Sequence, residues 1–125
     1  MPLRISILYI EEELAEVSEV ANALKESGDI FVVQHVAEWK DASDRIEAGE
    51  FDVAIFGIHD TGKSMDSMMQ LHEYAPNLPI LATGMELNME IVSMTVKRGA
   101  KVYLPQPLNP RRLLAIIKKA VAESG

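Results

Sequence analysis

One segment of the chain carries residue types that bind phosphate in other proteins. From Gly57 to Ser64 the residues read Gly-Ile-His-Asp-Thr-Gly-Lys-Ser, which matches the spacing Gly-x-x-x-x-Gly-Lys-Ser. In a phosphate-binding loop of this pattern, backbone N–H groups surround the phosphates and the lysine reaches the outer ones. The segment follows an apolar run and precedes a helix-period stretch, which is the context that such a loop requires. Nucleotide binding through residues 57–64 is therefore one candidate function.

Acidic side chains form a second candidate group. Glu11 and Glu12 follow the first apolar run, and His59 and Asp60 follow the run that ends at Gly57. Oxygen ligands of this kind are what magnesium prefers, so a weak response to metal or phosphate through Glu11, Glu12 and Asp60 is an alternative. We nevertheless expect His59 and Asp60 to be solvated loop residues, because loops are polar and metal sites need a supported geometry.

The composition sets the broad class of protein. The chain has 125 residues, 48% of them hydrophobic and 25% charged, so we expect one globular domain over residues 1–125. Cysteine is absent, which excludes disulfides and thiolate metal sites. The net charge of −7 disfavours nucleic acid and anionic membrane as partners. No apolar run approaches the roughly 18 residues of a membrane span, and we expect a cytoplasmic protein.

Apolar runs alternate with helix-period stretches five times along the chain. The predicted strands are residues 4–10, 30–36, 52–57, 80–83 and 101–104. The predicted helices are residues 12–27, 38–48, 64–74 and 88–98, with a fifth that begins after Asn109. This alternation predicts an α/β fold with a doubly wound parallel sheet. For the strand order 2-1-3-4-5, ligands bind between strands one and three, where Glu11, Glu12, Gly57 and His59 would meet.

Four segments, in order and spacing, resemble the segments that characterise one protein family. They are residues 7–13, 51–57, 78–84 and 98–107. Together they make the chain similar to the CheY-like receiver domains of response regulators in two-component phosphorelay signalling. The resemblance covers essentially the whole chain. It implies a flavodoxin-like sheet of five strands with five helices, and a signalling module rather than an enzyme.

The chain departs from this family at the positions that carry phosphoryl chemistry. Gly57 stands where the resemblance places the phosphorylated aspartate, and Gln106 stands where it places a lysine. Gly84 stands at the hydroxyl position, although a shift of one residue would put Thr83 there. Phosphoryl transfer requires a nucleophile, a metal ion and cationic stabilisation. The departures therefore imply a degenerate receiver, or pseudo-receiver, that has no catalytic residues and acts without phosphorylation.

The remaining acidic pair does not favour a metal or a nucleotide. Glu11 and Glu12 match the family's acidic residues, the second one methylene longer than the usual aspartate. With no third carboxylate at position 57, we expect neither Mg²⁺ nor another cofactor. Nucleotide binding is the less favoured reading because the Gly-Lys-Ser pattern follows the third predicted strand. No later strand ends in an aspartate, and Asp60 would place negative charge beside the phosphates.

The resemblance also points to a partner surface. By analogy with the family, a protein partner or a second copy would bind the face of the fourth helix, fifth strand and fifth helix. Its residues would be Met94, Lys97, Arg98, Lys101, Tyr103, Arg111 and Arg112. This patch is basic on an acidic chain, which suits an acidic partner.

Several side chains have a structural and a functional interpretation. Tyr103 aligns with the family's aromatic switch residue, and both an inward ring and a half-exposed ring are consistent with the sequence. The Gln106–Pro107 bond aligns with a peptide bond that is usually cis, and we predict cis here. Trp39 is expected to pack on the sheet rather than anchor an interface. The methionines are expected to fill the core, with a partner groove as the alternative: Met65, Met68, Met69, Met85, Met89 and Met94.

Overall fold

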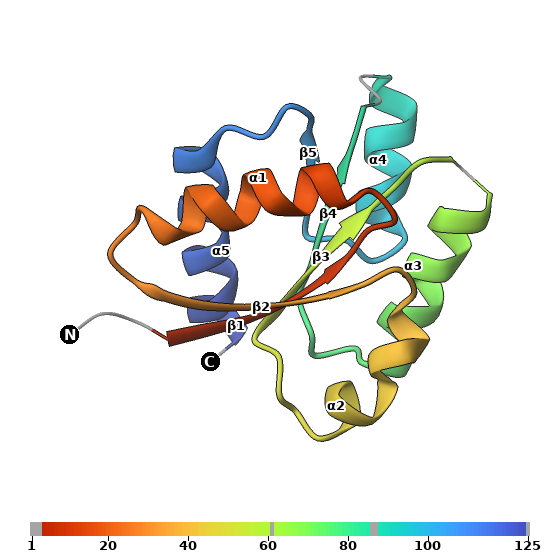
Figure 1. Ribbon diagram of the computed structural model, residues 1–125. Helices are drawn as coiled ribbons and strands as arrows, with labels where there is room; N and C mark the ends of the chain where they lie inside the picture. The colour runs from red at the N-terminus through yellow and green to blue at the C-terminus, as the bar shows by residue number, and fades with distance from the viewer. Residues whose placement is uncertain (1–3, 61, 86–87, 125) are drawn as a thin grey trace.

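The computed structural model describes residues 4–60, 62–85 and 88–124, and over these ranges five parallel strands alternate with five α-helices (Figure 1). The strands are β1 Arg4–Ile10, β2 Ile30–Val36, β3 Val53–Gly57, β4 Ile80–Gly84 and β5 Val102–Pro105. The helices are α1 Leu14–Lys25, α2 Ser43–Glu47, α3 Lys63–Tyr74, α4 Met89–Lys97 and α5 Pro110–Ser124. The sheet order β2-β1-β3-β4-β5 confirms the predicted flavodoxin-like topology.

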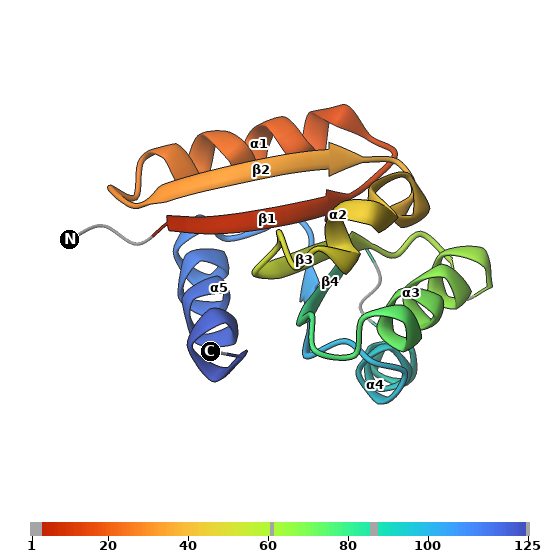
Figure 2. The same cartoon turned by 90° about the horizontal axis from the view of Figure 1, so that it is seen from below.

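The two faces of the sheet are covered by different helices, as Figures 1 and 2 show. Helices α1 and α5 pack on one face, where their side chains meet Ile7, Tyr9, Ile55 and Leu81. The other face packs against α2, α3 and α4. Both β3 and β4 are buried along their whole length, which explains why they read as continuous apolar runs. Each fully buried aliphatic side chain contributes about 1.5–3 kcal/mol to folding.

The boundaries differ from the predicted ones mainly around the helices. The helix expected over residues 12–27 is α1, Leu14–Lys25, and Gly28 follows it with φ +85°, the conformation expected of a glycine that ends a helix. The helix expected over residues 38–48 is instead a 3₁₀ turn, Trp39–Ala42, followed by α2. Ala42 breaks the helix because its backbone, at φ −112° and ψ 13°, lies outside the helical region.

The tryptophan and two methionines lie in the core. Trp39 is 6% exposed and its ring centroid lies 5.1 Å from that of Tyr74, which confirms the packing expected for it. Met65 and Met68 are fully buried. The same expectation is wrong for Met85 and Met89, which are 73% and 72% exposed. Within the described residues, no helix is both long and apolar enough to cross a bilayer.

The strand register sets the geometry of the site. Gly57 pairs with Thr83, and Gly84 pairs with Pro105, so the two glycines end neighbouring strands. Glu11 follows directly after β1, the other neighbour of β3, and its N–H donates to Val36 O at 3.0 Å. The residues predicted to carry chemistry therefore project from adjacent strand ends, at the carboxyl edge of the sheet.

Candidate functional site

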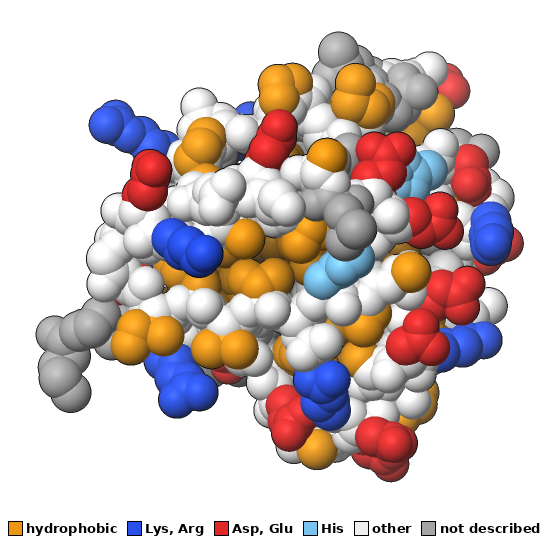
Figure 3. All heavy atoms as spheres, in the orientation of Figure 1, with side chains coloured by type: hydrophobic (Ala, Val, Ile, Leu, Met, Phe, Trp, Pro, Cys, Tyr) orange, Lys and Arg blue, Asp and Glu red, His pale blue; other side chains and the backbone are white. Residues whose placement is uncertain are grey.

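A pocket of about 400 Å³ opens at the carboxyl edge of the sheet, between the ends of β1 and β3. Glu11, Glu12, Gly57, His59 and Asp60 all line it, so the structure brings together the residues that topology placed there. Acidic side chains gather on the right-hand side of the molecule in the view of Figure 3. Within the described ranges, no group of three or more His, Asp or Glu side chains is arranged to hold a metal ion.

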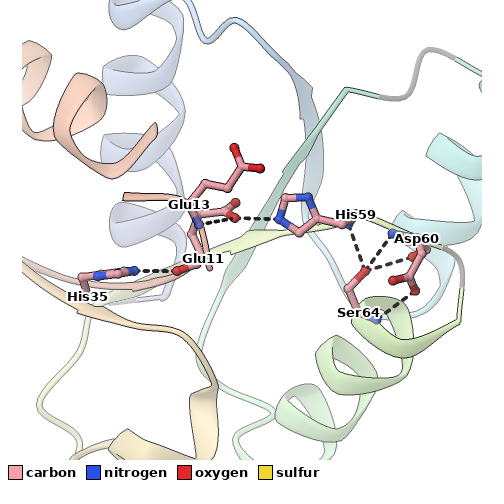
Figure 4. A network of polar contacts seen from close by, with 6 residues as sticks. All are labelled: Glu11, Glu13, His35, His59, Asp60 and Ser64. Carbon is pink, nitrogen blue, oxygen red and sulfur yellow. Dashed lines mark hydrogen bonds and ion pairs between the residues drawn. The ribbon is translucent and has the colours of Figure 1, made fainter. Parts of the chain in front are cut away.

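Glu11 is buried in this pocket and is held from three directions (Figure 4). Its side chain is fully buried, and Oε1 accepts hydrogen bonds from His59 Nε2 at 2.6 Å and from Glu13 N at 3.1 Å. Its backbone carbonyl oxygen accepts from His35 Nε2 at 2.5 Å. Since a carbonyl can only accept, Nε2 of His35 carries the hydrogen. Glu11 Oε2 makes no hydrogen bond within the described part of the chain.

The carboxylate of Glu11 occupies the space above Gly57. A Cβ atom added to Gly57 would overlap Glu11 Oε2 and would lie 2.9 Å from its Cδ. Real Cβ atoms do not approach other atoms so closely, so a side chain at position 57 and this conformation of Glu11 exclude each other. The position that the resemblance assigns to a phosphorylated aspartate is thus filled by a carboxylate from the neighbouring strand end.

The space above Gly84 is filled in a similar way by Tyr103. A Cβ atom at Gly84 would lie 2.5 Å from Tyr103 Oη and 2.7 Å from the carbonyl oxygen of Ile58. Tyr103 is only 5% exposed, so of the two readings left open for its ring the inward one holds. Tyr103 therefore does not present its side chain on the expected partner face. Thr83, the other candidate for the hydroxyl position, is fully buried and does not line the acidic pocket.

Gln106 lies apart from the acidic pocket. Its backbone N–H donates to Gly84 O at 2.9 Å, and its bond to Pro107 is cis, as predicted. It lines a second pocket of about 340 Å³, a largely apolar groove between α1 and the start of α5 that also contains Met85 and Leu108. Gln106 therefore sits one strand end beyond Gly84, and it does not share a cavity with Glu11.

In the loop from Gly57 to Ser64, backbone N–H groups donate hydrogen bonds to side chains of the same loop. Ser64 Oγ accepts hydrogen bonds from the N–H groups of His59 and Asp60 at 3.0 and 3.1 Å. Asp60 Oδ1 accepts from the N–H groups of Gly62 and Ser64 at 2.9 and 3.1 Å. Thr61 lies outside the described residues. These four N–H groups bind acceptors of the loop itself, whereas in a phosphate-binding loop such groups are directed at the phosphates.

His59 makes a contact that the sequence analysis does not predict. The sequence predicts a solvated loop residue here, but the ring of His59 binds the buried carboxylate of Glu11, with 40% of the side chain still exposed. Asp60 is exposed as expected, and it also caps the first turn of α3. A detectable signal was present: a glycine at position 57 leaves room for a long carboxylate at position 11, and a buried carboxylate needs a nearby donor.

The first prediction concerns the contact between Gly57 and Glu11. Gly57→Ala should lower the free energy of unfolding by about 1–3 kcal/mol, because the new methyl group overlaps the buried carboxylate. In a Glu11→Ala background the same change should cost less than about 0.5 kcal/mol, since the obstacle is gone. Urea unfolding of the four proteins measures this coupling.

Gly62→Ala is the matched control, because the nearest neighbour of its added Cβ is Asp60 Oδ1 at 3.7 Å. Equal costs of Gly57→Ala in the two backgrounds would show that Glu11 does not occupy the space above position 57.

The second prediction concerns Gly84. Gly84→Ala should destabilise the protein by about 1–3 kcal/mol, because the added methyl meets both Tyr103 Oη and a backbone oxygen. Tyr103→Phe should relieve this cost only in part, since the Ile58 carbonyl oxygen stays 2.7 Å away. Thermal unfolding of both single variants and the double variant tests the difference. A neutral Gly84→Ala would be inconsistent with the inward Tyr103.

Comparisons with known proteins identify which solved structures share this fold. No protein-family model matches the chain, and no curated protein matches its sequence. Among solved structures, a CheY-like response regulator receiver domain protein from Methanospirillum hungatei is 23% identical, with a TM-score of 0.78 over 99% of this chain and 97% of that one. A response regulator from Thermotoga maritima is 20% identical, with a TM-score of 0.83 and coverage of 96% and 99%.

A third solved structure, a two-component response regulator from Clostridium difficile, is 18% identical, with a TM-score of 0.79 and coverage of 94% and 96%. These likenesses extend over nearly the whole of each chain, and they include the strand order and the five flanking helices. The sequence identity is low in all three cases, so the likeness concerns the fold. The chain therefore has the CheY-like, flavodoxin-like fold of response regulator receiver domains.

Proposed function

We propose that this chain is a receiver-like module of two-component signalling that acts by protein–protein interaction without being phosphorylated. The observation that carries the proposal is the occupied space above Gly57. A receiver phosphorylated in the family's way needs a carboxylate nucleophile there, and instead the buried carboxylate of Glu11 fills the position. The module would have no catalytic role of its own.

The remaining chemistry of the site supports the same conclusion. Transfer of a phosphoryl group to an aspartate needs a nucleophile, a metal ion and a cation for the equatorial oxygens. Position 57 has no side chain, and Gln106 supplies no charge and lines a different cavity. Glu11, which would have been a metal ligand, is already hydrogen-bonded to His59 and to Glu13 N. The nucleophile is thus absent at position 57, the metal ligand is already engaged, and position 106 supplies no cation, although Lys40 and Lys63 line the acidic pocket.

The inward Tyr103 suggests that the module has one resting conformation. In receivers that the sequence resembles, an aromatic residue at this position moves when the hydroxyl residue does. Here Gly84 has no side chain to move, and the ring already fills the space beside it. We infer that the partner face is fixed by packing rather than set by phosphorylation.

An acidic protein is the partner that this face suits best. Lys97, Lys101, Arg111 and Arg112 are exposed on or beside α4, β5 and α5, while Arg98 and Met94 are half-buried. A basic patch on a chain of net charge −7 attracts an acidic surface and repels a second copy of itself. The proposal therefore assigns this basic patch to a different protein rather than to a homodimer.

The third prediction tests the loss of phosphorylation. Incubation of the protein with Mg²⁺ and acetyl phosphate should leave its intact mass unchanged, because no aspartate lies at the acceptor position. The matched variant combines Gly57→Asp, which restores a carboxylate at position 57, with Glu11→Asp, which shortens the side chain that blocks this position. A receiver that accepts phosphate serves as the positive control. A phosphoryl group added to the unaltered chain would contradict the proposal. It would favour the alternative of a weakly responsive receiver that uses Glu11, Glu12 and Asp60.

The fourth prediction separates the module from a nucleotide-binding domain. Calorimetry with Mg²⁺ and ATP at about millimolar concentration should detect no heat of binding. At this ligand concentration, a binding free energy of about −4 kcal/mol is detectable. The physical reason is that the loop's N–H groups already bind Ser64 Oγ and Asp60 Oδ1. Saturable heat that Lys63→Ala abolishes would instead establish the phosphate-binding loop.

A further inference from the structure

The outer strand β2 has features of an interaction surface that the proposed function does not use. It is one of the two edges of the sheet, and none of its seven residues is buried. Ile30 and Val32 are 52% and 43% exposed on the face of the sheet that carries α2. Figure 3 shows hydrophobic side chains along the lower left of the molecule, over this strand. An apolar strip is therefore open to solvent along β2.

The sequence of β2 lacks the devices that normally protect an edge strand. Ile-Phe-Val-Val-Gln-His-Val contains no Lys, Arg, Asp, Glu or Pro, although a quarter of the whole chain is charged. The opposite edge, β5, has only four residues and ends at Pro105. Edge strands are usually shortened, charged or interrupted by proline, because their free N–H and C=O groups pair readily with another strand. Of the two edges, only β2 is both long and unprotected.

The short helix α2 explains why the strip is uncovered. It has five residues, and Nη1 of its Arg45 donates to Gln34 Oε1, in the second half of β2, at 2.8 Å. The first half of the strand, with Ile30 and Val32, extends beyond this contact. In Figure 2, α2 lies over one end of β1 and β2 and leaves the other end bare.

The direction of the backbone groups on β2 follows from its pairing with β1. Val36 O accepts from Glu11 N, so the carbonyl of Val36 is directed at β1. In a parallel ladder alternate residues point their N–H and C=O groups to the same neighbour. Phe31, Val33 and His35 therefore direct theirs to the open edge. Three evenly spaced residues can each exchange a pair of hydrogen bonds with an added strand.

We propose that β2 pairs with β2 of a second copy of this chain, antiparallel about a two-fold axis at Val33, so that the two sheets form one continuous sheet. This register matches every outward residue with another: Val33 meets Val33, and Phe31 meets His35. On the α2 face it places Ile30 opposite Val36 and Val32 opposite Gln34, which gives both residues of the apolar strip a cross-strand neighbour. Two-fold pairing of identical surfaces is the commonest arrangement of homo-oligomers.

The charges favour a second copy at this edge. No like charges oppose one another on β2 itself. The exposed Arg4 lies at one end of the strip, next to Ile30, and the exposed Glu12, Glu13 and Glu38 lie beyond the other end. An antiparallel pair brings opposite ends together, so the basic end of one copy faces the acidic end of the other. The basic patch on α4, β5 and α5 has no such complement in a second copy.

Sedimentation velocity at protein concentrations up to about 0.5 mM, where weak dimers are populated, tests the proposal. We expect a monomer–dimer equilibrium that Val32→Lys weakens by about tenfold or more, because the two lysines meet diagonally beside the axis. Met89→Lys is the matched control, since it changes an equally exposed hydrophobic residue on α4, and it should leave the dimer unchanged. Circular dichroism checks that each variant is folded.

Two further variants test the strand pairing itself. Val33→Pro removes an N–H directed away from β1, so the monomer should fold and the dimer should be lost. Val33→Cys introduces the only cysteine of the chain and should form an intermolecular disulfide rapidly, since paired residues lie within disulfide range, whereas Met89→Cys should not. A monomer at every concentration would overturn the proposal. So would a dimer that withstands Val32→Lys and Val33→Pro, or equal cross-linking of the two cysteine variants.

Discussion

The hydrogen bond between Glu11 and His59 is the constraint on which the rest of this site depends. A carboxylate that loses its water must regain hydrogen-bond donors, because an unpaired buried charge costs several kcal/mol. Glu11 obtains two donors, His59 Nε2 and Glu13 N, and the bond to His59 requires its side chain to turn toward the end of β3. That path is open only while position 57 is glycine. The missing side chain at position 57 and the buried, hydrogen-bonded carboxylate of Glu11 are therefore one structural feature.

The pair Gly84 and Tyr103 follows the same physical logic at the next strand end. Protein interiors are close-packed, so the removal of a side chain at a buried strand end must be balanced by another group or by a cavity. Here the balancing group comes from β5, and its hydroxyl oxygen would lie 2.5 Å from an added Cβ at Gly84. Two glycines and two long polar side chains thus pack the carboxyl edge of a receiver fold, where a phosphorylatable receiver keeps room for a phosphoryl group.

The fold was predictable from the sequence to a greater extent than the site. Buried strands such as β3 and β4 are apolar along their whole length, so their positions and order follow from pattern alone. The carboxyl edge of the sheet then follows from topology, which is why Glu11, Gly57 and His59 could be placed together. Side-chain direction was not predictable in this way. Whether Glu11 turns toward β3 or toward solvent depends on a volume left free by a residue 46 positions away.

The exposed Met85 and Met89 illustrate another limit. A methionine suits a core and a surface groove equally well, since its side chain is flexible and only weakly polar. Helical spacing did not distinguish Met65 and Met68, which are buried residues of α3, from the exposed Met85 and Met89. Periodicity identifies the buried face of a helix from residues within that helix, whereas Met85 precedes α4 and Met89 is its first residue.

The Gly-Lys-Ser pattern shows why spacing alone does not define a phosphate site. A phosphate-binding loop works because several N–H groups converge on one empty point, with no acceptor of the protein there. In this loop Ser64 and Asp60 supply acceptors at such points, so the N–H groups are satisfied before any ligand arrives. A ligand would have to displace four hydrogen bonds and approach the Asp60 carboxylate as well. The serine that completes the sequence pattern is thus the residue that closes the loop, and the feature that suggested phosphate binding is part of the structure that opposes it.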